Sequence, residues 1–179
     1  LFGGTSLFTS YRPTSQLANK GADQFFVCAR EAFDRRRLTN HGPLVEQLET
    51  SLKSLHNTAH CVTFSNACMA IMVTLRVLAN GREGNVVLPA MSYRGLPHLV
   101  RWAGLTPKYC DIDPVRHTLE PKALSETIDS KTVAVLAVDN VNAMCDVDAI
   151  EAITNSQEVP LLLDSVHGIG GKHGADICG

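Results

Sequence analysis

Short apolar runs alternate with helical patterns along the chain from residue 61 onward. The apolar runs predict five strands, at 61–64, 86–89, 107–111, 132–138 and 159–163. Between them, apolar residues recur every three or four positions and predict helices over 66–79, 93–104, 120–128 and 146–155. Strands such as VAVLAV are continuously apolar, which is typical of strands buried on both faces. We therefore predict a three-layer α/β/α fold with a mostly parallel sheet and helices on both faces.

The first 60 residues have a different pattern. Residues 1–22 mix Gly and Pro with Ser and Thr and predict an irregular N-terminal arm. Asp23 is a candidate cap for a helix over 24–37, and Pro43 is a good first residue for a second helix that carries leucines at helical spacing. This organisation divides the chain into an arm (1–22) and one domain (23–179).

Composition and charge narrow the classes of function. The chain has 179 residues, of which 45% are apolar and 19% charged, so it can bury a core and is not intrinsically disordered. Its net charge of −2 gives no electrostatic reason for a nucleic-acid or membrane-surface partner. The longest apolar runs are strand-sized, which excludes a membrane-spanning helix. The first 13 residues also lack the basic start and apolar middle of a signal peptide.

Cysteines, histidines and glycines do not form a known binding motif. The six cysteines are scattered without a C-x-x-C pair, which favours reduced thiols in a cytoplasmic protein. His56 and His60 are four residues apart but have no H-E-x-x-H motif, so we expect no metal site. The G-x-G-G segment at 168–171 does not fit the G-x-G-x-x-G pattern of dinucleotide-binding proteins.

Candidate chemistry lies where the predicted strands end, because ligands of parallel sheets bind beyond the carboxyl ends of the strands. Ala67 and Cys68 begin a helix whose free N–H groups form either a phosphate seat or an ordinary helix start. Asp164 ends a very apolar strand, where a carboxylate is costly unless it meets a cation or hydrogen-bond donors. It is either a ligand contact or a structural cap, and Tyr93 and His167 are either site or packing residues.

Five segments, in order, carry a resemblance to a known family. They are LTNHGPLVEQLE (38–49), HCVTFSNACMAIMVTLRVL (60–78), NVVLPAMSYRGLPHLVRWAGLTPKYCDID (85–113), VDNVNAMCDVDAI (138–150) and VPLLLDSVHG (159–168). Over residues 38–171 the chain resembles the DegT/StrS-type aminotransferases. These are fold type I enzymes that use pyridoxal 5'-phosphate (PLP) and act mostly on keto-sugars attached to nucleotides.

The resemblance implies a role for each candidate residue. Asp164 would pair with the pyridine nitrogen of PLP, Tyr93 would stack on the ring, and His167 would approach the phenolic oxygen of the ring. Ala67 and Cys68 would bind the phosphate. The implied reaction transfers an amino group from an amino acid, expected to be glutamate, to a keto-sugar, and the implied enzyme is a cytoplasmic homodimer.

The sequence departs from the family pattern at several positions. Cys68 replaces a Thr, Asp139 stands where the family often has His, and Asn142 replaces a Gly. Lys172, the only lysine after Asp164, is too close to that aspartate to match the family's Schiff-base lysine. We therefore expect the chain to be the arm and an incomplete PLP-binding large domain of a longer enzyme, without the C-terminal domain. The alternatives are a PLP-dependent sugar dehydratase relative and a non-catalytic fragment that lacks the lysine.

Overall fold

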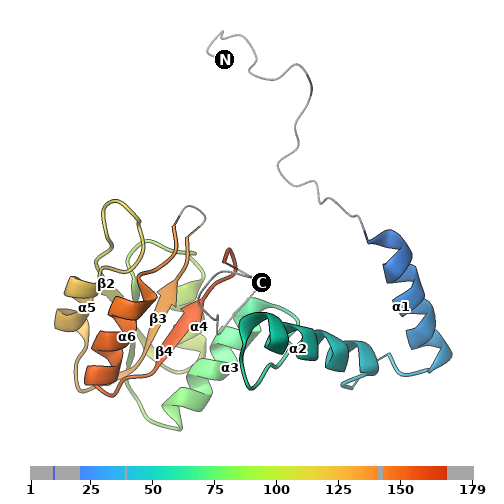
Figure 1. Cartoon of the computed structure of the whole chain (residues 1–179). Coiled ribbons are helices and arrows are strands. Elements are labelled where there is room, and N and C mark those ends of the chain that lie inside the picture. Colours follow the sequence, from blue (N-terminus) through green and yellow to red (C-terminus); the bar gives the residue numbers. More distant parts are fainter. Residues whose placement is uncertain (1–9, 11–20, 39, 141–142, 169–179) are drawn as a thin grey trace. The chain divides into compact units, whose positions relative to one another are not determined.

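The computed structural model describes residues 10, 21–38, 40–140 and 143–168 (Figure 1). The chain divides into two compact units, Leu1–Gln47 and Leu48–Gly179, with the boundary inside a helix. The predicted arm (1–22) lies outside the described residues except for Ser10, Gly21 and Ala22. The segment 169–179, which contains most of the G-x-G-G pattern and Lys172, also lies outside them.

The described part of the chain before residue 57 contains two helices. Helix α1 covers Ala22–Asp34, and helix α2 covers Pro43–His56 and crosses the boundary between the units. The prediction that Asp23 caps α1 is wrong, because the helix begins two residues earlier, at Ala22, with a bond from the Phe25 N–H to the Gly21 carbonyl. Asp23 instead lies in the first turn, where a negative charge is favourable next to the helix dipole.

The second unit contains a sheet of four parallel strands. These are β1 (Asn85–Pro89), β2 (Thr106–Cys110), β3 (Thr132–Val138) and β4 (Leu161–Asp164). The strand order is β2-β1-β3-β4, and every adjacent pair is parallel. Four of the five predicted strands are therefore present, and β3 has the predicted bounds.

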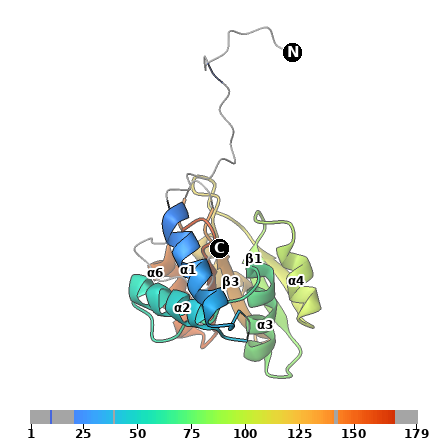
Figure 2. The same ribbon diagram turned by 90° about the vertical axis from the view of Figure 1, so that its right-hand side faces the viewer.

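Helices cover both faces of this sheet (Figures 1 and 2). Helices α3 (Ala67–Ala79) and α4 (Leu96–Trp102) pack on one face, and α5 (Pro121–Thr127) and α6 (Val147–Ser156) pack on the other. Each face of the sheet has its own hydrophobic core, and alternate β3 residues point into one core or the other. Leu136 packs with α3 and α4, whereas Val135 packs with α5 and α6. This arrangement confirms the predicted three-layer α/β/α fold.

The predicted strand at 61–64 is wrong. These residues have no strand structure, and Val62 and Phe64 are 71% and 42% exposed. The carboxylate of Glu49 on α2 accepts both the Thr63 N–H (2.8 Å) and the Thr63 hydroxyl (3.0 Å). A side chain thus satisfies the backbone donor that a neighbouring strand would otherwise bind, and within the described part of the chain no strand pairs with this segment.

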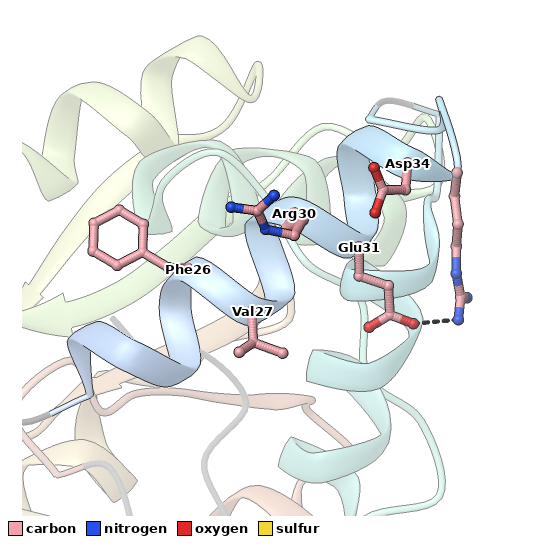
Figure 3. Close-up of a pocket in the computed structure, with 6 residues that line it drawn as sticks. Phe26, Val27, Arg30, Glu31 and Asp34 are labelled. Carbon is pink, nitrogen blue, oxygen red and sulfur yellow. Dashed lines mark hydrogen bonds and ion pairs between the residues drawn. The ribbon is translucent and has the colours of Figure 1, made fainter.

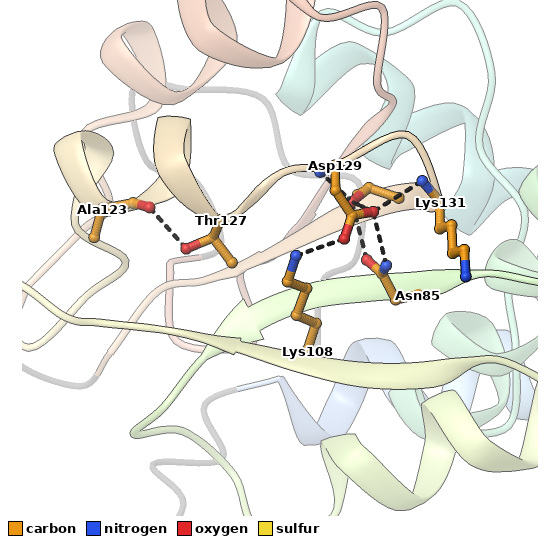
Figure 4. A network of polar contacts seen from close by, with 7 residues as sticks. Asn85, Lys108, Ala123, Thr127, Asp129 and Lys131 are labelled. Atoms are coloured by element: carbon orange, nitrogen blue, oxygen red, sulfur yellow. Dashed lines mark hydrogen bonds and ion pairs between the residues drawn. The ribbon is translucent and has the colours of Figure 1, made fainter.

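A polar network ties together the amino ends of three strands (Figure 4). The Asp129 carboxylate, in the loop before β3, accepts hydrogen bonds from Lys108 Nζ (2.7 Å), Asn85 Nδ2 (3.0 Å) and the Lys131 N–H (2.8 Å). The Thr132 hydroxyl donates to Asn85 Oδ1 (2.9 Å). Because Asn85, Lys108 and Thr132 belong to β1, β2 and β3, the network fixes the register of the strands at this edge.

Because of this network, the free energy of unfolding depends on pH in the acidic range. The bonds from Lys108, Asn85 and Lys131 lower the pKa of Asp129. A lowered folded-state pKa stabilises the fold above the unfolded pKa of about 4, and this contribution is lost as pH falls through the folded-state pKa. We expect Asp129→Asn to lower the urea midpoint at pH 7, and the difference from the unaltered protein to shrink at pH 3. The control is Glu126→Gln, an exposed position on α5; an Asp129→Asn difference of equal size at both pH values would contradict the prediction.

Candidate functional site

The carboxyl ends of the four strands lie at one edge of the sheet, because all the strands are parallel. The chain leaves β1 toward α4 on one face and leaves β3 toward α6 on the other, while β1 and β3 are neighbours. Such a point, where the strand order reverses, is where ligands bind in open α/β sheets. Helix α3 runs back to the start of β1 and therefore begins at this same edge.

The first turn of α3 presents backbone N–H groups at this edge. The Asn66 side chain caps the helix by accepting the Met69 N–H (3.0 Å), and the Asn66 carbonyl accepts the Ala70 N–H. The N–H groups of Ala67 and Cys68 precede the first helical hydrogen bond and point out of the helix end. Both side chains are half-buried against the core beneath α3 and α4.

Asp164 is the last residue of β4 and is only 7% exposed. Along β4, Leu162 packs on the face of α3 and α4 and Leu163 on the opposite face, so the Asp164 side chain belongs to the face of α3 and α4. Burial raises the pKa of Asp164, opposed by a long hydrogen bond from the Val166 N–H (3.4 Å) and by nearby His167. The carboxylate is therefore buried with few donors, which is the costly situation expected from the sequence.

His167 lies in the turn that follows β4. This turn closes with a hydrogen bond from the Gly168 N–H to the Ser165 carbonyl (2.9 Å), and the His167 side chain is exposed. Its charge lowers the pKa of Asp164, so the structure brings these two candidate residues together electrostatically.

Tyr93 lies in the connection between β1 and α4, at the same edge of the sheet. Its side chain is 60% exposed, and its ring covers Gly95, where a Cβ atom would come within 2.3 Å of Tyr93 Cε1. Among the described residues, no hydrogen bond or ion pair joins Tyr93 to Asp164. The structure therefore places Tyr93 at the predicted edge, with its ring over Gly95.

Two functional candidates were given no role by the sequence: Asp139 and Ser165. Asp139 follows β3 and is 1% exposed, and its carboxylate accepts the Ser165 hydroxyl (2.6 Å) and the Cys145 N–H (2.7 Å). The same signal that marked Asp164, a carboxylate directly after a continuously apolar strand, is present at Asp139.

A shallow groove lies along one side of α1 (Figure 3). It is lined by Phe26, Val27, Arg30, Glu31, Asp34 and Arg35, and its one ion pair joins Glu31 to Arg35. All six residues come from α1 and the residue after it, so a single helix lines this groove and we assign no substrate site to it.

The described residues contain neither a membrane-spanning helix nor a metal-binding group. None of their helices is long and apolar enough to span a membrane, and no three of their His, Cys, Asp and Glu side chains are grouped as metal ligands. The five described cysteines are free thiols, and burial is the main cause that raises the pKa of Cys145 to about 12.

Comparison with known proteins identifies relatives for almost the whole chain. The family model for the DegT/DnrJ/EryC1/StrS aminotransferase family matches residues 20–179. The chain is 27% identical over 158 residues to dTDP-4-amino-4,6-dideoxy-D-glucose transaminase of Escherichia coli, covering 88% of this chain and 42% of the relative. It is 29% identical over 132 residues to UDP-2-acetamido-2-deoxy-3-oxo-D-glucuronate aminotransferase of Pseudomonas aeruginosa, covering 74% and 37%.

The chain is also similar to a solved structure. DesI, crystallised in the presence of its TDP-sugar product, matches with a TM-score of 0.75 and 30% identity, over 83% of this chain and 38% of DesI. The chain thus spans about two fifths of the length of the proteins that it matches.

Proposed function

The chain belongs to the DegT/DnrJ/EryC1/StrS aminotransferase family, and we propose that it is the N-terminal part of a PLP-dependent sugar aminotransferase. In this proposal residues 1–22 are an arm and 23–179 an incomplete PLP-binding domain. The reaction moves the amino group of glutamate to the keto carbon of a nucleotide-linked sugar, and glutamate leaves as 2-oxoglutarate. Support comes from the relatives of E. coli and P. aeruginosa, whose names describe aminotransferases of dTDP- and UDP-linked sugars.

The observation that carries the proposal is the buried carboxylate of Asp164. Pyridoxal phosphate, when bound, supplies a ring that accepts the electron pair left at the substrate carbon. A carboxylate beside the pyridine nitrogen keeps a proton on that nitrogen. Asp164 fits this task because it is 7% exposed and lies at the carboxyl edge of the sheet, and because within the described part of the chain its carboxylate accepts a single long hydrogen bond, from the Val166 N–H.

The other candidate residues fit the remaining parts of the cofactor. The N–H groups of Ala67 and Cys68 at the start of α3 suit a phosphate, since a helix N-terminus binds anions. Cys68 replaces the hydroxyl that the family supplies at this point, so the backbone has to bind the phosphate largely unaided. In the proposal the exposed aromatic face of Tyr93 stacks on the ring, and His167, which lies near Asp164, approaches the phenolic oxygen of the ring.

Cysteine protection tests this assignment without relying on catalysis. Pyridoxamine 5'-phosphate carries the same ring and phosphate but cannot bond covalently to a lysine, so its binding depends on the contacts proposed above. At saturation we expect it to slow the alkylation of Cys68 at least about tenfold, measured at each cysteine by mass spectrometry. Pyridoxamine, which lacks the phosphate, is the matched control. Equal effects of the two compounds on Cys68 would contradict a phosphate seat at α3.

Amino transfer by the complete protein tests the reaction itself. Formation of 2-oxoglutarate from glutamate beyond one equivalent per active site is expected only when a nucleotide-linked keto-sugar is present. Loss of a sugar hydroxyl without net amino transfer would instead identify a dehydratase. We propose that residues 1–179 alone bind PLP weakly and reversibly and are inactive, because Lys172 lies too close to Asp164 to match the family's Schiff-base lysine.

We also propose that the protein is a cytoplasmic homodimer. Helix α1 exposes three phenylalanine side chains, Phe25, Phe26 and Phe33, each about two-thirds exposed. Exposed apolar patches of this kind mark interaction surfaces. Sedimentation at micromolar concentration is expected to give a dimer or a larger assembly, and a well-behaved monomer would count against the proposal.

A further inference from the structure

A second buried carboxylate, Asp139, contacts the end of β4 and the turn 165–168, which contains His167. Its backbone N–H donates to the Asp164 carbonyl (2.9 Å), and its Oδ2 accepts the Ser165 hydroxyl (2.6 Å). Its Oδ1 accepts the Cys145 N–H (2.7 Å), and its side chain is 1% exposed. One residue therefore binds both the end of β4 and the first residue after it.

These bonds determine the face of the sheet on which each side chain lies. Val138, the last residue of β3, packs on the face of α3 and α4, so Asp139 belongs to the opposite face, where Cys145 also packs. Ser165 turns to that same face to reach Asp139. The residue before it, Asp164, consequently stays on the face of α3 and α4.

Gly168 closes the turn tightly against this pair. A Cβ atom at Gly168 would come within 2.2 Å of Ser165 Oγ and 3.0 Å of Asp139 Oδ2, and within 2.6 Å of Met144 Cε. No side chain fits there without displacing the hydrogen bond between Ser165 and Asp139. Residues 165–168 are thus fastened at both ends, by that bond and by the bond from the Gly168 N–H to the Ser165 carbonyl.

We propose that Asp139 is a positioning residue, which holds the turn 165–168 and thereby sets the positions of Asp164 and His167 toward the cofactor. The inference rests on the proposed function of the site. What Asp139 supplies to this turn is a set of hydrogen bonds, to the Ser165 hydroxyl and to the backbone carbonyl of Asp164. The contribution of Asp139 is therefore geometric, made through Ser165 and through the backbone of β4.

Two variants change this contact in different ways. Ser165→Ala removes the hydroxyl and leaves the charge of Asp139, whereas Asp139→Asn removes the charge and leaves an oxygen for the Cys145 N–H. The control is Cys145→Ala, which removes the thiol that donates to the Val138 carbonyl (3.2 Å) in the same buried layer. That control keeps both the Cys145 N–H and the Ser165 contact of Asp139.

Two properties are measured on the complete protein after its cofactor has been removed. Hydrogen exchange at the Gly168 amide is expected to accelerate about tenfold or more in Ser165→Ala, while the amide of Leu162 within β4 is unchanged. The affinity for pyridoxamine 5'-phosphate is expected to fall about tenfold in the same variant, and less in Asp139→Asn. Cys145→Ala is expected to retain both the slow exchange and the affinity, even where its urea midpoint is lower.

Several results would overturn the positioning role. Faster exchange at Gly168 with unchanged affinity would make Asp139 a structural residue only, and unchanged exchange in both variants would mean that the turn does not depend on it. An equal loss of affinity in Cys145→Ala would indicate general loosening. If Asp139→Asn does not fold, the comparison of Ser165→Ala with the control decides. Failure of the unaltered protein to bind pyridoxamine 5'-phosphate would overturn the proposed function, and the inference with it, independently of any variant.

Discussion

Replacing Asp164 with Asn in the complete protein is expected to lower the rate of amino transfer by several orders of magnitude while the fold is retained. A neutral amide cannot keep the pyridine nitrogen protonated, so the ring loses its capacity to accept electrons. The two side chains have nearly the same shape, so the packing around β4 is preserved. Steady-state turnover with glutamate and a nucleotide-linked keto-sugar measures the effect.

The stability of this variant has a predictable sign. Burial raises the pKa of Asp164 in the folded state, so the folded protein binds the proton more tightly than the unfolded chain. Stability contributed by this group is therefore present at low pH and is lost as pH rises through the folded-state pKa. At neutral pH we expect Asp164→Asn to melt no lower than the unaltered protein. The control is Asp148→Asn, an exposed position on α6, which is expected to keep normal turnover; near-normal turnover in Asp164→Asn would contradict the role of Asp164.

Shortening Leu136 to Ala is expected to destabilise the protein by about 2–5 kcal/mol. Leu136 lies in β3, between β1 and β4, and is completely buried in the core beneath α3 and α4. Removing its branched end leaves a cavity that the sheet cannot close, because its neighbours are held by strand hydrogen bonds. Urea unfolding followed by circular dichroism measures the loss.

The matched control for this core position is Val115→Ala. Val115 is 84% exposed, and its truncation is expected to change the free energy of unfolding by less than about 0.5 kcal/mol. A loss of less than about 1 kcal/mol in Leu136→Ala would mean that the core around β3 relaxes to fill the space, contrary to the packing described.

The sequence pattern correctly predicted those strands that are recognisable from their own residues alone. The strand at 132–138 has the predicted bounds because each of its residues from Val133 on is buried, and continuous burial leaves a continuous apolar run. The run at 61–64 has similar composition but is not a strand, since a strand also requires a neighbour and Thr63 binds Glu49 instead. Composition cannot indicate whether that neighbour is present.

In the candidate site, too, some residues could be predicted from the sequence and others could not. Asp164 was predictable because a carboxylate after an apolar strand is costly wherever the chain places it. Asp139 carries the same signal, but its partners Cys145 and Ser165 come from two separate segments, and only the structure shows that they meet. The position of Tyr93 over Gly95 likewise depends on the path of the loop between β1 and α4, which no residue pattern specifies.

The purely parallel sheet also has a consequence for how the chain folds. No described strand is joined to its neighbour by a hairpin, so every pairing has to wait for a crossover through a helix. The contact between Asn85 and Thr132, at the start of the central pair β1 and β3, joins residues 47 positions apart. Closing such long loops before any pairing energy is gained slows folding, and during that delay the continuously apolar strands are exposed to other chains. The strand order that creates the edge for a ligand therefore also prolongs the time during which the apolar strands of a newly made chain are exposed.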